Sequence, residues 1–303
     1  MTTPRNSAAR ESRSVPRAGV RFDLRYPLGI LVLASLTALY WFSGFEMYKA
    51  WVIVDSYYSH GFLIPFISLF FVWKQRAGLM RSDDEPAGWG YALIVASILV
   101  LLASDFLGFR VAGEFSLIPM LFGVAAVTLG RRRTGLLWFP IAFLIFMVPI
   151  PASLTQSVAL KLKLLATQCA VALANWCTLP MVRDGSFIHF NNDKLQVGEV
   201  CGGLRSLIAL LAFGALMAYI SKTKPWARAA LLLMSGPVAV ITNVLRIFAL
   251  CIVGYFWGSD VAAGKFHDIS GMMIFVVAFI MFFAIETQLR RWAPAASTGE
   301  GRE

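Results

Sequence analysis

The chain has 303 residues, of which 58% are hydrophobic and only 15% are charged. Soluble domains usually carry about 25% charged residues, so this apolar excess is too large for one globular core. The composition excludes a soluble enzyme, a secreted disulfide module and a disordered chain, and it indicates an all-α integral membrane protein. The net charge of +10 does not indicate a nucleic-acid partner, because the Lys and Arg residues form short clusters between apolar runs. Such clusters are typical of the loops that orient membrane helices.

Residues 1–26 contain six Arg among Ser, Pro and few apolar residues, which predicts a disordered basic arm in the cytoplasm. This arm is similar to the start of a signal peptide. However, the apolar run that follows is too long for one and has no small-residue cleavage site, so it indicates an uncleaved first helix. A single membrane domain is predicted over 27–290, and residues 291–303 are predicted to be a disordered cytoplasmic tail.

Eight apolar segments are predicted to cross the hydrocarbon core, which is about 30 Å thick. They are residues 27–45, 57–73, 89–107, 115–130, 135–150, 201–220, 229–256 and 268–286. Residues 154–178 are also apolar but contain Lys161 and Lys163 near their start. We interpret this segment as an interfacial or re-entrant helix on the outer side of the membrane.

The distribution of basic residues supports eight spans. With eight, the side that holds both termini collects 18 Lys and Arg and the opposite side collects 7. Cytoplasmic loops carry the excess of basic residues, so both termini are predicted to be cytoplasmic. A ninth span at 154–178 would place the basic cluster at 222–228 and the tail outside, which contradicts this rule.

With eight spans, residues 179–199 form an external loop. In this loop, Asn191–Asn192–Asp193 predicts a small hairpin over 186–198.

This orientation brings three distant side chains to one depth. Cys201 begins the sixth span on the outer side, and His267 directly precedes the eighth span on the same side. Arg246 lies 17 residues into the seventh span. At 1.5 Å per residue it is roughly 26 Å above the inner start of that span. A thiol, a guanidinium and an imidazole are therefore predicted to converge near the outer surface.

Cys201 is followed by Gly202 and Gly203 at the expected start of a helix. The positive end of a helix dipole lowers the pKa of a thiol and so favours the nucleophilic thiolate. The two glycine N–H groups would allow close approach of a substrate and could stabilise an oxyanion. Arg205 lies one turn deeper. The alternative is that Cys201 is a small buried residue and that the glycines serve helix packing.

Arg246 stands alone in an apolar span. An isolated Arg costs ~2.5–3.5 kcal/mol near the centre of a membrane helix and less near an interface. Such a residue faces a polar cavity or, alternatively, reaches the lipid headgroups. Asn243 is three residues earlier and shares its helix face. His267 is a candidate general base for a thiol or, alternatively, an interfacial capping residue. Asp268 is predicted to cap the eighth helix.

His60 also lies on the outer side and is a rival candidate for the base, or a structural or substrate-positioning residue. His189 is expected to be exposed in the external loop. The other cysteines, Cys169, Cys177 and Cys251, have no flanking glycines, so they are predicted to pack in the core. The four cysteines lack metal-ligand spacing, and neither a metal site nor a disulfide framework is indicated. No cofactor is expected.

Three blocks of this sequence resemble the signature blocks of exosortases and the related archaeosortases. They are residues Val200–Ser206, Asn243–Ile247 and Phe266–Asp268, and Tyr58–Gly61 is also similar. The resemblance covers most of 27–290 and implies a membrane-embedded thiol transpeptidase. It further implies Cys201 as nucleophile, Arg246 as catalytic arginine and His267 as acid/base, with Arg205 and Asn243 in support. Gly202 departs from the family, which often has Ser or Thr there, and this weakens any role for a hydroxyl.

The resemblance also implies the partners. Substrates would be exported proteins with a C-terminal tail made of a Pro-Glu-Pro-like motif, one membrane helix and a basic cluster. The enzyme would cut at the motif, at the periplasmic face of a bacterial inner membrane, and transfer the protein to an exopolysaccharide or lipid acceptor. From the residues alone, two alternatives stay open. One is a non-enzymatic component of polysaccharide export or assembly, in which Arg205 and Arg246 bind anionic lipid or glycan. The other is a small transporter.

Overall fold

The computed structural model describes residues 32, 34–53, 56–81, 85–191, 193–198 and 203–293. The chain divides into two compact units, residues 1–41 and 42–303. The described part of the first unit is helical over 34–39. The second unit contains the candidate functional residues. Cys201 and Gly202 lie outside the described residues.

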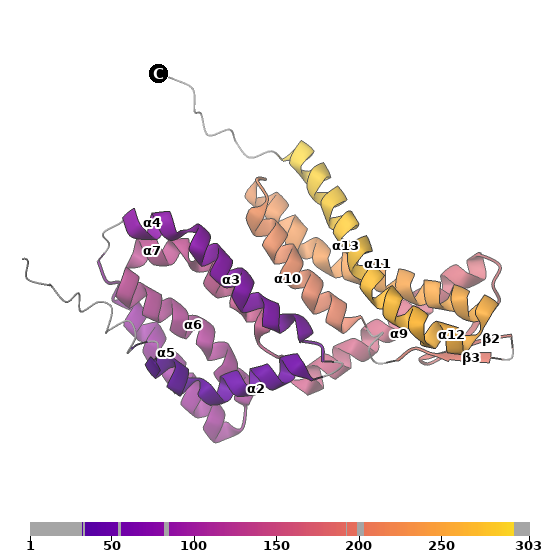
Figure 1. The fold of residues 1–303 in the computed structure, drawn as a ribbon, viewed down its shortest axis with the longest axis horizontal. Helices are drawn as coiled ribbons and strands as arrows, with labels where there is room; N and C mark the ends of the chain where they lie inside the picture. Colours follow the sequence, from indigo (N-terminus) through magenta and orange to yellow (C-terminus); the bar gives the residue numbers. More distant parts are fainter. Residues whose placement is uncertain are drawn as a thin grey trace, which may run out of the picture. The chain divides into compact units, whose positions relative to one another are not determined.

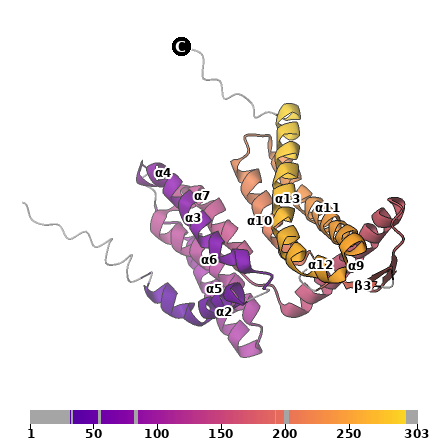
Figure 2. The ribbon, with the colours of Figure 1, turned by 45° about the vertical axis from the view of Figure 1, so that its right-hand side comes forward.

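The first half of the chain forms short and medium helices. They are α2 (Trp41–Val52), η1 (Ser59–Phe62), α3 (Leu63–Lys74), α4 (Arg76–Arg81), α5 (Trp89–Leu107), α6 (Arg110–Leu129), α7 (Arg131–Leu136), α8 (Trp138–Phe143) and η2 (Leu144–Met147). The second half contains longer helices and a small sheet (Figures 1 and 2). These are α9 (Ala152–Trp176), β1 (Val182–Asp184), β2 (Phe187–Phe190), β3 (Asp193–Gln196), α10 (Leu204–Ile220), α11 (Pro225–Trp257), α12 (Ser259–Ala263) and α13 (Lys265–Trp292).

Five helices among the described residues are long and apolar enough to cross a membrane. They are α5, α6, α9, α11 and the Ile269–Trp292 part of α13. Three shorter apolar helical segments cover Ser59–Lys74, Trp138–Met147 and Leu204–Ile220. A helical protein with several candidate membrane spans is therefore confirmed, whereas the count of eight stays a prediction. Because α9 has the length and composition of a span, its interfacial placement also stays a prediction.

Two predicted spans differ strongly from the structure. The first was expected to end at residue 45, but α2 continues to Val52, and an ion pair of 3.0 Å between Glu46 and Lys49 lies on its surface. The start of that span lies outside the described residues. The expected helix over 135–150 is broken into α7, α8 and η2. Pro140 explains the break, because it has no N–H to donate to the carbonyl of Leu136, where α7 ends.

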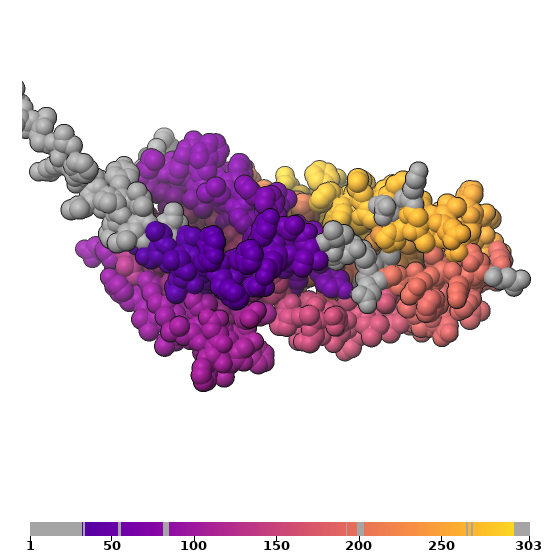
Figure 3. All heavy atoms as spheres, turned by 60° about the horizontal axis from the view of Figure 1, so that its bottom comes forward, coloured from indigo at the N-terminus to yellow at the C-terminus, as the bar shows by residue number. Residues whose placement is uncertain are grey.

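The predicted hairpin is confirmed and is part of a three-stranded antiparallel sheet of order β1-β2-β3. Strands β2 and β3 pair Ile188 with Leu195, and the unpredicted β1 pairs Arg183 with Ile188. Ile188 and Leu195 are buried in one core with residues of α9 and α11. This core fixes the sheet against the two helices, and Figure 3 shows the strands and α9 beside the C-terminal helices.

The three described cysteines differ in burial. Cys251 is fully buried in the core between the sheet, α9 and α11, as predicted, and Cys169 packs against that core. Cys177 is exposed, so the prediction of core packing is wrong there. It follows the last residue of α9, where the chain turns through Thr178 with a φ of 64°. A separate core of Leu210, Val238, Ala278 and neighbouring residues joins α10, α11 and α13.

Candidate active site

Arg246 and His267 are in contact where α11 packs against α13. The guanidinium Nη2 of Arg246 lies 3.3 Å from Nε2 of His267 and donates to the His267 carbonyl at 3.2 Å. A guanidinium has only N–H donors, so the ring nitrogen that faces it accepts the hydrogen bond.

Two residues of α13 that the sequence reasoning missed complete this contact. Arg246 Nε donates to Ser270 Oγ at 3.3 Å, and the same hydroxyl donates to the His267 carbonyl at 2.8 Å. At Gly271 an added Cβ would lie 3.0 Å from Arg246 Nη2, so glycine allows the guanidinium to lie close to the helix. Their spacing in the sequence could have indicated them, because residues three and four positions after His267 lie on the same helix face as His267.

The start of α13 differs from the prediction. The helix begins at Lys265 with Gly264 as its N-cap, so the expected start at Asp268 and its role as the cap are wrong. The reason is that the short helix α12 ends at Ala263 and the chain changes direction at Gly264, at a φ of −87° and a ψ of −130°. His267 therefore lies inside the first turn of α13, and its N–H donates to the Gly264 carbonyl at 3.0 Å.

Gly203 brings the chain after Cys201 against α11. It is the N-cap of α10 with a φ of 74°, a conformation that favours glycine. A Cβ at this position would lie 2.6 Å from the amide nitrogen of Asn243. Asn243 is only 2% exposed and is three residues before Arg246. The structure therefore places parts of all three sequence blocks on or against α11: Gly203, Asn243 with Arg246, and His267.

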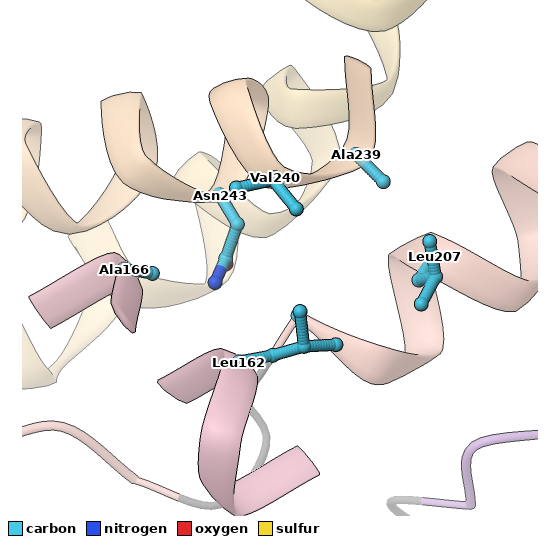
Figure 4. Close-up of a pocket in the computed structure, with 7 residues that line it drawn as sticks. Leu162, Ala166, Leu207, Ala239, Val240 and Asn243 are labelled. Carbon is cyan, nitrogen blue, oxygen red and sulfur yellow. The ribbon is translucent and has the colours of Figure 1, made fainter. Parts of the chain in front are cut away.

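Asn243 also faces a narrow cavity between α9, α10 and α11 (Figure 4). The other side chains that line it are apolar and include Leu162, Leu207 and Val240. Because the amide is the polar group of this cavity, Asn243 can orient a polar atom next to Gly203. Arg205 follows on the first turn of α10, where it is half-buried and its Nε and Nη2 atoms are enclosed.

His60 lies in η1 and is half-buried. Its neighbour Tyr58 belongs to the same apolar cluster as Leu204, the first residue of α10. Tyr58 also accepts a hydrogen bond from the Ile150 N–H at 2.8 Å. Among the described residues, His60 makes no hydrogen bond with Arg246 or His267. His189 is exposed on β2, as predicted. The described residues contain no group of three or more His, Cys, Asp and Glu suited to a metal ion.

A family model described as transmembrane exosortase matches residues 41–284, which is most of the chain. The chain belongs to the exosortase family. This exosortase is therefore a multi-pass membrane protein, and its family supports a general role in membrane transpeptidation and protein sorting. No curated protein and no solved structure matches the chain significantly. The matched range includes His60, Cys201, Arg246 and His267.

Proposed function

We propose that this exosortase is a cysteine transpeptidase that removes the C-terminal sorting tail of exported proteins. The tail has a Pro-Glu-Pro-like motif, one membrane helix and a basic cluster. The observation that carries the proposal is the 3.3 Å contact between Arg246 and His267. The position of Gly203 against Asn243 supports it, because it ties the chain next to Cys201 to the same helix as Arg246.

In the proposed reaction, the Cys201 thiol gives its proton to the ring of His267 and the sulfur attacks the carbonyl carbon of the scissile peptide bond. A C–S bond forms, and the carbonyl oxygen becomes an oxyanion. The intermediate collapses, the C–N bond breaks, and His267 returns the proton to the leaving amine on the tail. A hydroxyl or amine of a surface acceptor, or water, then opens the thioester and frees the thiol.

Arg246 would stabilise the oxyanion or hold an acidic side chain of the substrate. Its partners among the described residues include no carboxylate: they are the ring and carbonyl of His267 and the hydroxyl of Ser270. A permanently charged, planar guanidinium suits carboxylate and oxyanion recognition. Its positive charge is thus available for the negative charge that develops during acyl transfer.

We place this reaction at the outer face of a bacterial cytoplasmic membrane, with both termini in the cytoplasm. The basic residues in the expected inner loops support this orientation. The membrane helix of the substrate's own tail would hold the scissile bond at the depth of the site. An exopolysaccharide or a lipid at the cell surface would serve as acceptor.

Replacement of the proposed nucleophile tests the function most directly. In cells that make a reporter with a sorting tail, Cys201→Ala and Cys201→Ser are each expected to lower tail removal by at least about a thousandfold. The measurement is the ratio of processed to unprocessed reporter at equal amounts of membrane enzyme. Cys177→Ala, a change at an exposed cysteine, is the control and should process normally. Tail removal that survives in Cys201→Ala would overturn the thioester mechanism.

A further inference from the structure

A cavity of about 160 Å³ lies between β3 and the helices α11, α12 and α13. Its lining includes Leu195, Val197, Gly198, Leu250, Ala262 and His267. Leu195, Val197, Leu250 and Ala262 are each at most 3% exposed and belong to the core between the sheet, α9 and α11. His267 contributes the titratable group of this lining. The cavity is therefore an apolar recess with an imidazole in its wall.

The size of the recess limits what it can hold. An engineered cavity of about 150 Å³ in another protein binds benzene. A recess of about 160 Å³ thus accommodates one apolar side chain rather than several residues. Apolar walls favour an apolar side chain, because a polar group placed there would lose its hydrogen bonds to water.

The recess is close to the proposed chemistry in two ways. His267 is in its wall, and the same imidazole contacts Arg246. Gly198, also in its wall, precedes Cys201 by three residues. Three residues of fully extended chain span at most about 11 Å. A side chain in the recess and a peptide bond at the thiol can therefore belong to the same short stretch of substrate.

The outer edge of β3 offers a place for the backbone of that substrate. β3 is an edge strand of the described sheet. The Val197 N–H donates to the Ser186 carbonyl on the β2 side at 3.0 Å, whereas the Lys194 N–H donates to the carboxylate of Asp193 at 2.7 Å. Backbone groups alternate between the two edges of an antiparallel strand. The N–H and C=O of Gln196 thus face the outer edge, as those of Lys194 do.

We propose that the recess is a specificity subsite for one apolar side chain next to the scissile bond, on a substrate segment that extends β3 by strand addition. Strand addition supplies affinity through the main chain, and a pocket for an alternate side chain supplies selectivity. This subsite rests on the proposed transpeptidase function, since it assigns the part of the substrate that the same site binds.

Filling the recess tests the subsite. Ala263 is exposed at the rim of the recess, so Ala263→Leu adds volume there without entering the core. The reporter tail is varied to Gly, Ala, Leu or Phe at each position of its motif. At the motif position whose side chain enters the recess, the wild-type enzyme should cleave reporters with Leu or Phe faster than reporters with Gly or Ala. At that position, Ala263→Leu should lower the ratio of the cleavage rate with Leu to the cleavage rate with Gly by at least about 10-fold. One extra or missing methylene in an apolar pocket usually changes such a ratio by that much or more. Val261→Leu, on the exposed surface of the same helix, is the matched control.

The outcomes separate this inference from the proposed function. An Ala263→Leu variant with an unchanged preference, or with an equal loss on every reporter, would overturn the subsite while the Cys201 dependence of cleavage stands. Cleavage that survives in Cys201→Ala would instead overturn the proposed function. If Ala263→Leu does not accumulate in the membrane, Ala263→Val gives the same readout with a smaller expected shift.

Discussion

Helix α13 carries two polar clusters, one near each end, and they differ in charge balance. At the first, Arg246 of α11 contacts the ring and carbonyl of His267 and the hydroxyl of Ser270. At the second, the buried carboxylate of Glu286 accepts hydrogen bonds from Arg290 at 2.6 and 3.1 Å and from Ser221 at 3.1 Å. The second cluster pairs a cation with an anion, whereas the described partners of Arg246 include no carboxylate.

This difference indicates separate roles for the two clusters. A buried carboxylate that is paired and hydrogen-bonded is satisfied without any ligand, and it joins α13 to the segment between α10 and α11. A guanidinium without a carboxylate among its described partners keeps its positive charge for a ligand, and that charge acts more strongly where the dielectric constant is low. The Glu286 cluster should therefore stabilise the fold, and the Arg246 cluster should act on substrate.

The largest difference should appear when each arginine is changed to lysine. Arg246→Lys keeps the charge but loses the planar fork, and removal of such a donor typically costs about 10²–10³-fold in rate. Arg290→Lys retains a cation near Glu286 and should process the reporter within about 2-fold of wild type. The measurement is the rate of tail removal per folded enzyme. Full activity in Arg246→Lys would contradict the role of the guanidinium.

Neutralising the carboxylate of the second cluster should affect stability instead. Glu286→Gln removes the ion pair with Arg290 and weakens the acceptor of Ser221, so we expect a loss of about 1–3 kcal/mol in the free energy of unfolding. Glu46→Gln breaks the more exposed pair with Lys49, which should matter by less than about 0.5 kcal/mol. Thermal unfolding in detergent measures both. Equal melting temperatures for the two variants would refute the structural role of Glu286.

The Arg246 half of this contrast could be predicted from the sequence, whereas the Glu286 cluster was not. An isolated Arg in an apolar helix and a His at a helix start are visible as patterns, and the structure brings Arg246 and His267 together. The spans over 89–107 and 229–256 correspond to α5 and to the interior of α11, because long apolar runs leave little choice of structure.

Other features depend on tertiary contacts that no local pattern records. The contact of Gly203 with Asn243 depends on how α10 packs on α11, so the sequence indicated a glycine pair that allows close approach but not its partner. Ser270 and Gly271 have no distinctive local pattern, and their role follows only from their contact with Arg246 in the folded chain. The strand β1 was missed because a short strand is set by its neighbours rather than by its own propensity. The break after Leu136 is different, because its cause, Pro140, is a local feature of the sequence.

A methyl group at Gly271 should have a moderate effect on the first cluster. Because an added Cβ would lie 3.0 Å from Arg246 Nη2, the guanidinium of Gly271→Ala must shift by a few tenths of an ångström. We expect about a 3- to 10-fold slower tail removal, since catalysis depends on such positioning. Gly44→Ala, a helical position where an added Cβ meets nothing within 4 Å, is the control and should keep its rate. An unchanged rate in Gly271→Ala would show that the position of Arg246 tolerates this shift.

The smallest effect, a small change in stability, is expected from replacing Asp193. Its carboxylate belongs to β3, the strand that borders the subsite. Its oxygens accept hydrogen bonds from the N–H and hydroxyl of Ser259, both at 2.9 Å, and from the Lys194 N–H at 2.7 Å. The bonds from Ser259 and then that from Lys194 hold the pKa of Asp193 below its usual value of 3.8. Asp193 therefore binds β3 to α12 and is not a counterion that the structure pairs with Arg246.

A lowered pKa means that the charged form is favoured in the folded protein. The stabilisation is present above the pKa of the unfolded chain and is lost as the pH falls through the lower pKa of the folded state. Asp193→Asn should thus melt slightly earlier than wild type near neutral pH, and the difference should shrink as the pH falls below about 4. Asp184→Asn, at an exposed carboxylate of strand β1, is the control for the change of charge. A gap between wild type and Asp193→Asn that stays constant with pH would mean that Asp193 joins β3 to α12 by packing and not by its charge.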